Sequence, residues 1–153
     1  MEAELYKERQ PMPFRYVIAG IAMAVMLFGA WQTRLENPVS SLLMVFFAAA
    51  FGVVLWGFTE FSVVVTPTEV RFGFPLFRKH FALSEIQVGE TQRIALLAGI
   101  GIHYWQGKWV YNSRYGEGVN ISRGRRSYLL GSRHPLELQN ALMQGAPQRM
   151  VKP

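Results

Sequence analysis

The chain contains no cysteine and no aspartate. Without cysteine, a disulfide framework and thiolate chemistry are excluded. Without aspartate, most metal-assisted and paired-carboxylate reactions lose their usual side chains, because the polar half keeps only glutamates as acids. Those at alternating strand or turn positions are Glu69, Glu85, Glu90 and Glu117. We therefore expect a protein that is not an enzyme and that holds neither a cofactor nor a metal.

Charge is missing from two long stretches in the first sixty residues. No ionisable side chain lies between Glu36 and Glu60, and no charged one lies between Arg15 and Arg34. A helix needs about 20 apolar residues to cross a hydrocarbon layer of about 30 Å. The sequence therefore predicts two transmembrane helices, residues 16–33 and 39–58, joined by a loop over residues 34–38.

Two other interpretations compete with this hairpin. The second stretch has the composition of a buried helix in a soluble core, but soluble helices average about 11 to 12 residues. The first resembles a secretory signal peptide, yet no Ala-x-Ala cleavage site follows it. Small residues four apart, which favour close helix packing, occur at Gly20 and Ala24 and again at Ala48 and Gly52.

The distribution of Lys and Arg predicts the orientation. Positive charge beside membrane segments is retained in the cytoplasm. The loop carries only Arg34, whereas the flanks of the hairpin carry Lys7, Arg9, Arg15, Arg71, Arg78 and Lys79. We therefore expect a multi-pass protein of the cell (inner) membrane with both termini cytoplasmic. Residues 1–15 read as a poorly ordered N-terminal tail.

The remainder of the chain is basic. Residues 61–153 hold twelve Lys and Arg against five Glu, a net +7, whereas residues 1–60 hold four against five. Beside a membrane, a basic domain is attracted to anionic lipid headgroups. Nucleic acid is the other usual partner of such a domain, but the two apolar stretches favour the membrane.

Beyond Phe61 the periodicity changes to that of strands. Short β-branched or alternating segments are separated by turn residues such as Pro67, Gly73 and Pro75, which is typical of an antiparallel sheet of six to seven strands. A helix follows from Pro135 to Gly145, with Leu138, Ala141 and Leu142 on its apolar face. The expected fold class is a two-helix transmembrane hairpin followed by a mainly antiparallel β-sandwich or barrel, capped by a C-terminal α-helix. The β domain is expected over residues 59–145, with a C-terminal tail over 146–153.

Five segments in this order resemble the bacterial pleckstrin-homology-like (PH-like) domain membrane proteins. They are Val70–Pro75, Phe81–Ile86, Gly99–His103, Trp109–Asn112 and Leu130–Leu138. The resemblance implies a β-barrel next to membrane helices and a binding or scaffold role, with no catalytic residues to assign. In similar sequences an acidic cap often precedes the proline of the C-terminal helix, where this chain has His134.

No other motif indicates chemistry. His80, His103 and His134 have no second ligand at metal-binding spacing. The segment Gly99–Tyr104 lacks the third glycine of a dinucleotide-binding loop, and no helix pattern follows it. No Gly-x-Ser-x-Gly nucleophile elbow is present.

The best candidate for a binding site is a basic hairpin tip around residues 122–126. Basic loops on a membrane-tethered sheet fit anionic lipid or an acidic partner, and a solvated turn is the alternative. The candidate residues are Lys108, Arg114, Arg123, Arg125 and Arg126.

The sequence thus predicts a membrane-anchored, non-enzymatic interaction or scaffold module at the cytoplasmic face. It would bind a protein partner, a second copy of itself or anionic lipid, and not nucleic acid. An accessory subunit of a membrane enzyme is one alternative. A small oligomeric transporter is another, which the lack of charge inside either stretch disfavours.

Overall fold

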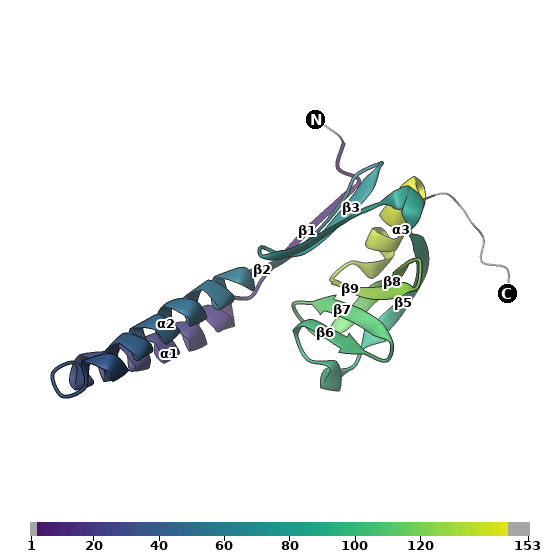
Figure 1. Ribbon diagram of the computed structural model, residues 1–153. Coiled ribbons are helices and arrows are strands. Elements are labelled where there is room, and N and C mark those ends of the chain that lie inside the picture. The colour runs from purple at the N-terminus through teal and green to yellow at the C-terminus, as the bar shows by residue number, and fades with distance from the viewer. Residues whose placement is uncertain (1–2, 147–153) are drawn as a thin grey trace. The chain divides into compact units, whose positions relative to one another are not determined.

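A computed structural model describes residues 3–146 of the chain, which divide into two compact units (Figure 1). Of these residues, 3–10 and 60–146 belong to the first unit, and 11–59 form the second. The second unit is a pair of helices, α1 (Pro13–Thr33) and α2 (Pro38–Gly57). Their bounds lie within three residues of those predicted. The expected C-terminal tail falls almost entirely outside the described residues.

The two helices of the pair begin and pack for local reasons. Proline stands in the first turn of each, where a missing amide proton costs nothing. The Asn37 side chain caps α2 by accepting a hydrogen bond from the Ser40 amide at 3.1 Å. Between the helices, the Ser41 hydroxyl donates to the Ala30 carbonyl at 2.8 Å. This bond satisfies a hydroxyl that would otherwise lie unpaired among apolar side chains.

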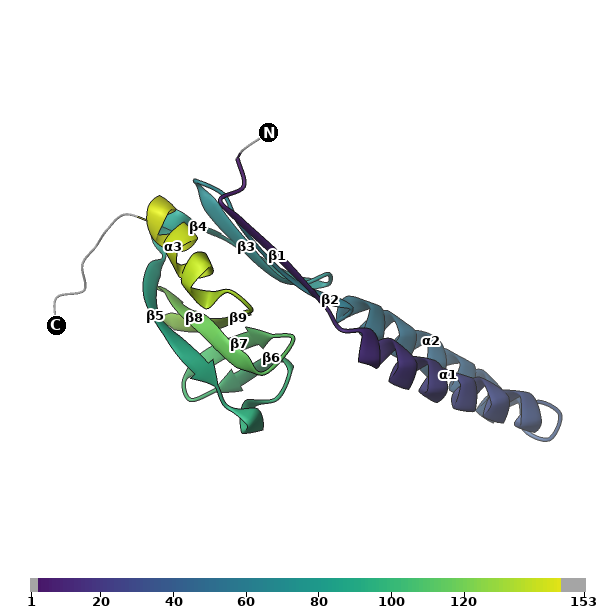
Figure 2. The same cartoon turned by 180° about the vertical axis from the view of Figure 1, so that it is seen from behind.

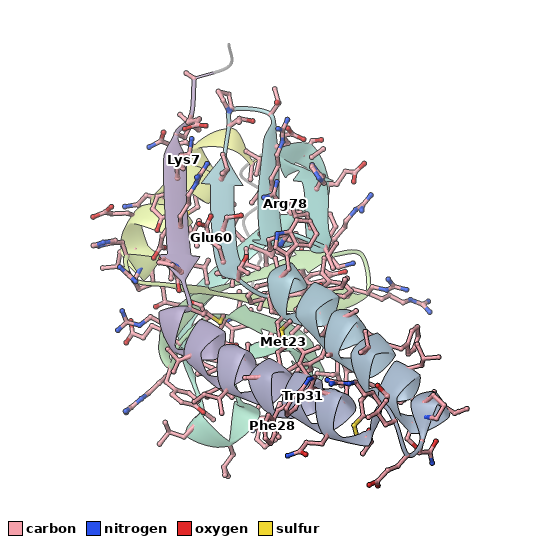
Figure 3. The ribbon with its side chains drawn as sticks, turned by 90° about the vertical axis from the view of Figure 1, so that its left-hand side faces the viewer. Lys7, Met23, Phe28, Trp31, Glu60 and Arg78 are labelled. Atoms are coloured by element: carbon pink, nitrogen blue, oxygen red, sulfur yellow. The ribbon has the colours of Figure 1, made fainter. Side chains whose placement is uncertain are left out.

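The predicted packing through small residues is correct for α2 and wrong for α1. Ala48 is buried, and a side chain at Gly52 would meet Met23 of α1 at 3.5 Å. Gly20 and Ala24, however, are exposed, and a Cβ at Gly20 would meet nothing within 4 Å. Figure 3 shows Met23 on the helix pair. The flexible thioether of Met23 therefore fills the space on α1 that the small-residue pattern assigned to Gly20 and Ala24.

Among the described residues, one helix is long and apolar enough to span a bilayer by length and composition. It is α2, with a mean hydropathy of 2.3 over its most apolar window. The stretch Val17–Thr33 of α1 is a shorter apolar segment.

The first sheet contains a strand that the sequence analysis missed. Its order is β1-β2-β3-β4, formed by β1 (Tyr6–Pro11), β2 (Glu60–Val65), β3 (Glu69–Phe74) and β4 (Phe77–Ala82). The Leu5 amide donates to the Val65 carbonyl at 2.8 Å, and Arg9 lies 3.7 Å from Glu60 across the two strands. Lys7 and Glu60 mark these neighbouring strands in Figure 3. The expectation of a poorly ordered N-terminal tail is therefore wrong for residues 6–11, which form a strand.

The second sheet has the order β5-β8-β9-β7-β6 (Figure 2). Its strands are β5 (Gln87–Ile94), β6 (Gly101–Trp105), β7 (Lys108–Asn112), β8 (Gly116–Arg123) and β9 (Arg126–Ser132). All its neighbours are antiparallel except β7 and β9, which pair in parallel with Lys108 opposite Ser127. The short turns η1 (Leu83–Glu85) and η2 (Leu96–Ala98) flank β5. Two mostly antiparallel sheets with a C-terminal helix agree with the predicted sandwich, although the described strands number nine rather than six to seven.

An aromatic cluster joins the two sheets. The ring of Phe72, on β3, lies 5.2 Å from that of Tyr111 on β7 and 5.9 Å from that of Tyr128 on β9. Phe81, on β4, lies 5.1 Å from Tyr128. These edge-to-face contacts are favourable beyond the apolar area that they bury. Burial raises the pKa of the Tyr111 hydroxyl to about 12, so it remains a neutral core residue at physiological pH.

Helix α3 (Pro135–Gly145) covers the sandwich as predicted. Leu138, Ala141 and Leu142 are buried, in agreement with the expected apolar face. The His134 side chain makes no capping bond; instead the His134 amide donates to the Ser132 hydroxyl at 2.9 Å. Gly145 is required at the helix end, because a Cβ there would lie 2.9 Å from the Pro67 carbonyl oxygen.

The pairing of β1 with β2 leads to a prediction about which residues the sheet domain requires. A chain in which residues 11–59 are replaced by a short Gly/Ser linker keeps β1 beside β2, and it should unfold cooperatively with a sheet-rich circular dichroism spectrum. The segment 59–145 alone exposes the β2 edge and should be less stable or aggregate. Equal midpoints for the two chains in urea would show that β1 contributes nothing.

Candidate functional site

The basic tip is a tight hairpin between β8 and β9. Arg123 pairs with Arg126, so Gly124 and Arg125 form the two-residue turn. Gly124 has a φ of 58°, which an L side chain adopts only with strain. The predicted hairpin with a basic tip is confirmed. Its three arginines, however, lie in different environments.

Arg123 is engaged within the domain. Its guanidinium lies 2.6 Å from a Glu85 carboxylate oxygen, and its Cζ lies 4.9 Å from the centre of the Phe81 ring. An ion pair and a cation–π contact together hold the side chain against the end of β4. These contacts therefore assign Arg123 a role in packing rather than in binding a ligand. The side chains of Arg125 and Arg126 form no hydrogen bond or ion pair with another described residue.

Lys108 lies at the same end of the second sheet as the tip. Its ammonium group donates to Gln92 Oε1 at 2.8 Å and to Asn120 Oδ1 at 2.7 Å. A lysine has three N–H donors, so one is left for a further acceptor. A shallow hollow of about 150 Å³ adjoins it, and its lining includes the polar residues Gln87, Asn120, Ser122 and Ser127.

Arg114 does not belong to this group. Lys108 pairs with Ser127 near the start of β9, and β7 then runs parallel to β9 away from the tip. Arg114 follows the far end of β7 (Lys108–Asn112), a strand that spans about 13 Å at about 3.3 Å per residue. The structure thus separates the five predicted residues into a tip group of four and a distant Arg114.

The tip group gathers positive charge at one end of the second sheet. Its exposed arginines attract an anion, while the Glu85 carboxylate lies against Arg123, and Ser122 and Ser127 line the hollow beside Lys108. Within the described part of the chain, no three His, Cys, Asp or Glu side chains lie together as a metal site. Burial lowers the pKa of His103, whose Nε2 has no hydrogen-bond partner among those residues.

The structure adds a buried polar cluster, centred on Glu8, that the sequence analysis did not identify. The Glu8 carboxylate accepts hydrogen bonds from the Ser132 hydroxyl at 2.7 Å and from the Gln10 amide group at 2.9 Å. It also accepts from the Arg133 backbone amide at 2.9 Å and from the Tyr6 hydroxyl. Glu8 is 8% exposed and Gln10 is 1% exposed. In the sequence, the one sign of this cluster is that hydrogen-bonding side chains occupy every second position at Tyr6, Glu8 and Gln10.

This Glu8 cluster is saturated and therefore structural. A carboxylate offers about four acceptor sites, and four donors occupy them here. Burial and the hydrogen bond to Glu8 both raise the pKa of the Tyr6 hydroxyl, which stays protonated and continues to donate. Gln10 extends the cluster by donating to the Gly131 carbonyl at 3.2 Å and accepting from the Ser113 hydroxyl. The cluster fastens β1 to β9 and to the loop after β7.

Replacing Glu8 by Gln should destabilise the protein. The amide keeps the size of the side chain but presents two N–H donors to a site built of donors, and it leaves at least one partner unsatisfied. A loss on the order of 1–3 kcal/mol in the free energy of unfolding is expected. The matched control is Glu4→Gln, since Glu4 is exposed and pairs only with Lys7. Equal unfolding midpoints for the two variants would contradict a structural role for the buried carboxylate.

The arginines of the tip should separate by their effect on stability. Arg123→Ser removes the contacts to Glu85 and Phe81 and should lower the free energy of unfolding by up to about 1 kcal/mol, as exposed pairs do. The double variant R125S/R126S should unfold at the wild-type midpoint. If all three arginines prove equivalent in thermal unfolding, the assignment of Arg123 to packing is wrong.

Comparison of the chain with protein-family models, with curated proteins and with solved structures finds no match.

Proposed function

We propose that the protein is a membrane-anchored, non-enzymatic interaction module. In this proposal α1 and α2 cross the membrane as a hairpin, and the two sheets with α3 form a PH-like domain at the cytoplasmic face. The domain binds a protein partner, a second copy of the chain or anionic lipid headgroups. The resemblance of five sequence segments to bacterial PH-like proteins supports the domain type.

The observation that carries the proposal is the apolar exterior of the helix pair. Large apolar side chains on both helices remain exposed after they pack together, for example Val25 at 66% and Leu42 at 71%. Apolar surface as continuous as this is unfavourable in water. In lipid the same surface is satisfied, and so is every backbone group of a helix. Others of this kind are Val17, Ile18, Ile21, Phe28, Phe46, Phe47 and Val53.

The ends of the hairpin support the orientation. Trp31 lies near the α1–α2 loop, and the Arg34 guanidinium lies 4.8 Å from its ring centre, a pairing suited to the membrane interface (Figure 3). Arg34 is the only cation of that loop, whereas the chain on the other side of both helices is rich in Lys and Arg. The positive-inside rule then favours an external loop and cytoplasmic sheets.

Binding is favoured over catalysis by the content of the domain. Its buried carboxylate is saturated by four donors, and Lys108, Arg125 and Arg126 gather at one end of the second sheet. Cations on a domain held beside a lipid surface meet anionic headgroups or an acidic partner at high local concentration. These three residues are the proposed contact for such a ligand.

Single-cysteine labelling tests the anchor and its orientation, because the chain has no cysteine of its own. Gln32→Cys, near the loop, should react in intact cells with a maleimide that cannot cross membranes. Ser84→Cys, an exposed residue of η1, should react only after permeabilisation. The reverse pattern would overturn the orientation, and equal reaction of both in intact cells would overturn the hairpin.

A further inference from the structure

The turn between β3 and β4 has apolar residues at the end of a conformationally restricted hairpin. Phe74 pairs with Phe77, which leaves Pro75 and Leu76 as the turn. Gly73 precedes it with a φ of +128°, and a Cβ there would lie 2.2 Å from the Phe77 carbonyl oxygen. Glycine and proline together hold this turn in one conformation. The side chains of the turn therefore project in a fixed direction.

The side chains of this turn combine apolar surface with positive charge. Leu76 is 47% exposed and Phe77 is 48% exposed. Arg78 and Lys79 follow directly on β4, and Figure 3 labels Arg78 there. No described carboxylate forms an ion pair with either cation. Exposed aliphatic and aromatic groups beside unpaired cations are the composition of a segment that enters the headgroup layer of a bilayer.

The turn lies at the end of the first sheet at which β2 follows α2 along the chain. Ser62 pairs with Gly73, so the turn lies at the end where β2 begins. β2 starts at Glu60, three residues after the last residue of α2, a reach of at most about 11 Å. At the opposite end of the same two strands lies the turn containing Pro67.

We propose that the β3–β4 turn is a second membrane contact, in which Leu76 and Phe77 enter the interfacial layer of the bilayer that holds α1 and α2. Arg78 and Lys79 then contact anionic headgroups. This inference rests on the proposed membrane anchor. Such a second contact would limit the orientations of the sheet domain at the membrane, and therefore those in which the basic tip meets a ligand.

Edge-strand protection is the competing explanation. β4 is an outer strand of its sheet, and cations on such strands prevent pairing with another chain. That role accounts for Arg78 and Lys79 but not for two exposed apolar side chains at the turn. The two explanations therefore differ in what surrounds Leu76.

The test uses the full chain in lipid vesicles with one environment-sensitive fluorophore on a single introduced cysteine. Leu76→Cys carries the fluorophore at the turn, Pro67→Cys at the opposite end of the same strands, and Ala49→Cys in the middle of α2. Emission wavelength and quenching by lipids spin-labelled near the headgroup report the surroundings of each position. We expect blue-shifted, quenched emission at position 76 and water-like, unquenched emission at position 67.

Position 49 separates the two ways to fail. Blue-shifted emission at position 49 with water-like emission at position 76 would overturn the inference and leave the anchor standing. Water-like emission at position 49 would overturn the anchor itself. Blue-shifted emission at position 76 without quenching by spin-labelled lipid would show that protein, such as a second copy, covers the turn, and would also overturn the inference.

The charged pair has its own test in the Leu76→Cys background. In vesicles with anionic lipid, R78S/K79S should reduce the ratio of inserted to free turn on the order of tenfold, since each cation at the surface contributes several-fold. In neutral vesicles the same double variant should change little. Equal quenching with and without the two cations in anionic vesicles would overturn the headgroup contact.

Discussion

The docking of strand β1 into the sheet domain depends on the Glu8 carboxylate. It lies almost fully buried, on a strand that precedes both helices in the sequence, and it accepts hydrogen bonds from Tyr6, Gln10, Ser132 and the Arg133 amide. Removing a carboxylate from water is costly unless its acceptor sites are occupied. The four donors meet that cost only when β1 is docked. The cluster therefore selects the arrangement in which the N-terminal strand belongs to the sheet domain.

This arrangement joins the helix pair to the sheet domain at two points of the chain. The sheet domain is made of chain from both sides of the helix pair, with one residue between β1 and α1 and two between α2 and β2. A domain attached by one linker rotates freely, whereas two short attachments restrain it. In the function proposed above, this restraint would give the basic tip less orientational freedom and so lower the entropy cost of binding a ligand there.

Helices and most strands were predictable from local patterns. Uncharged stretches of 18 or more residues predicted α1 and α2, and short strand-like segments between turn residues predicted β2 to β5, β7 and the β8–β9 hairpin. β1 was missed because its inward residues, Glu8 and Gln10, are polar, so that no apolar face appears. The parallel pairing of β7 with β9 and the contact of Arg123 with Glu85 join residues distant in sequence, and no local pattern specifies such partners.

Hydrogen–deuterium exchange of the full chain tests the central claim most directly. If Glu8 fastens β1 into the sheet, the amides of residues 6–10 should exchange as slowly as those of β3 (Glu69–Phe74), because both strands open only with the domain. Exchange of residues 6–10 as fast as that of the exposed Gly124–Arg125 turn would contradict the account and return this segment to a loose tail.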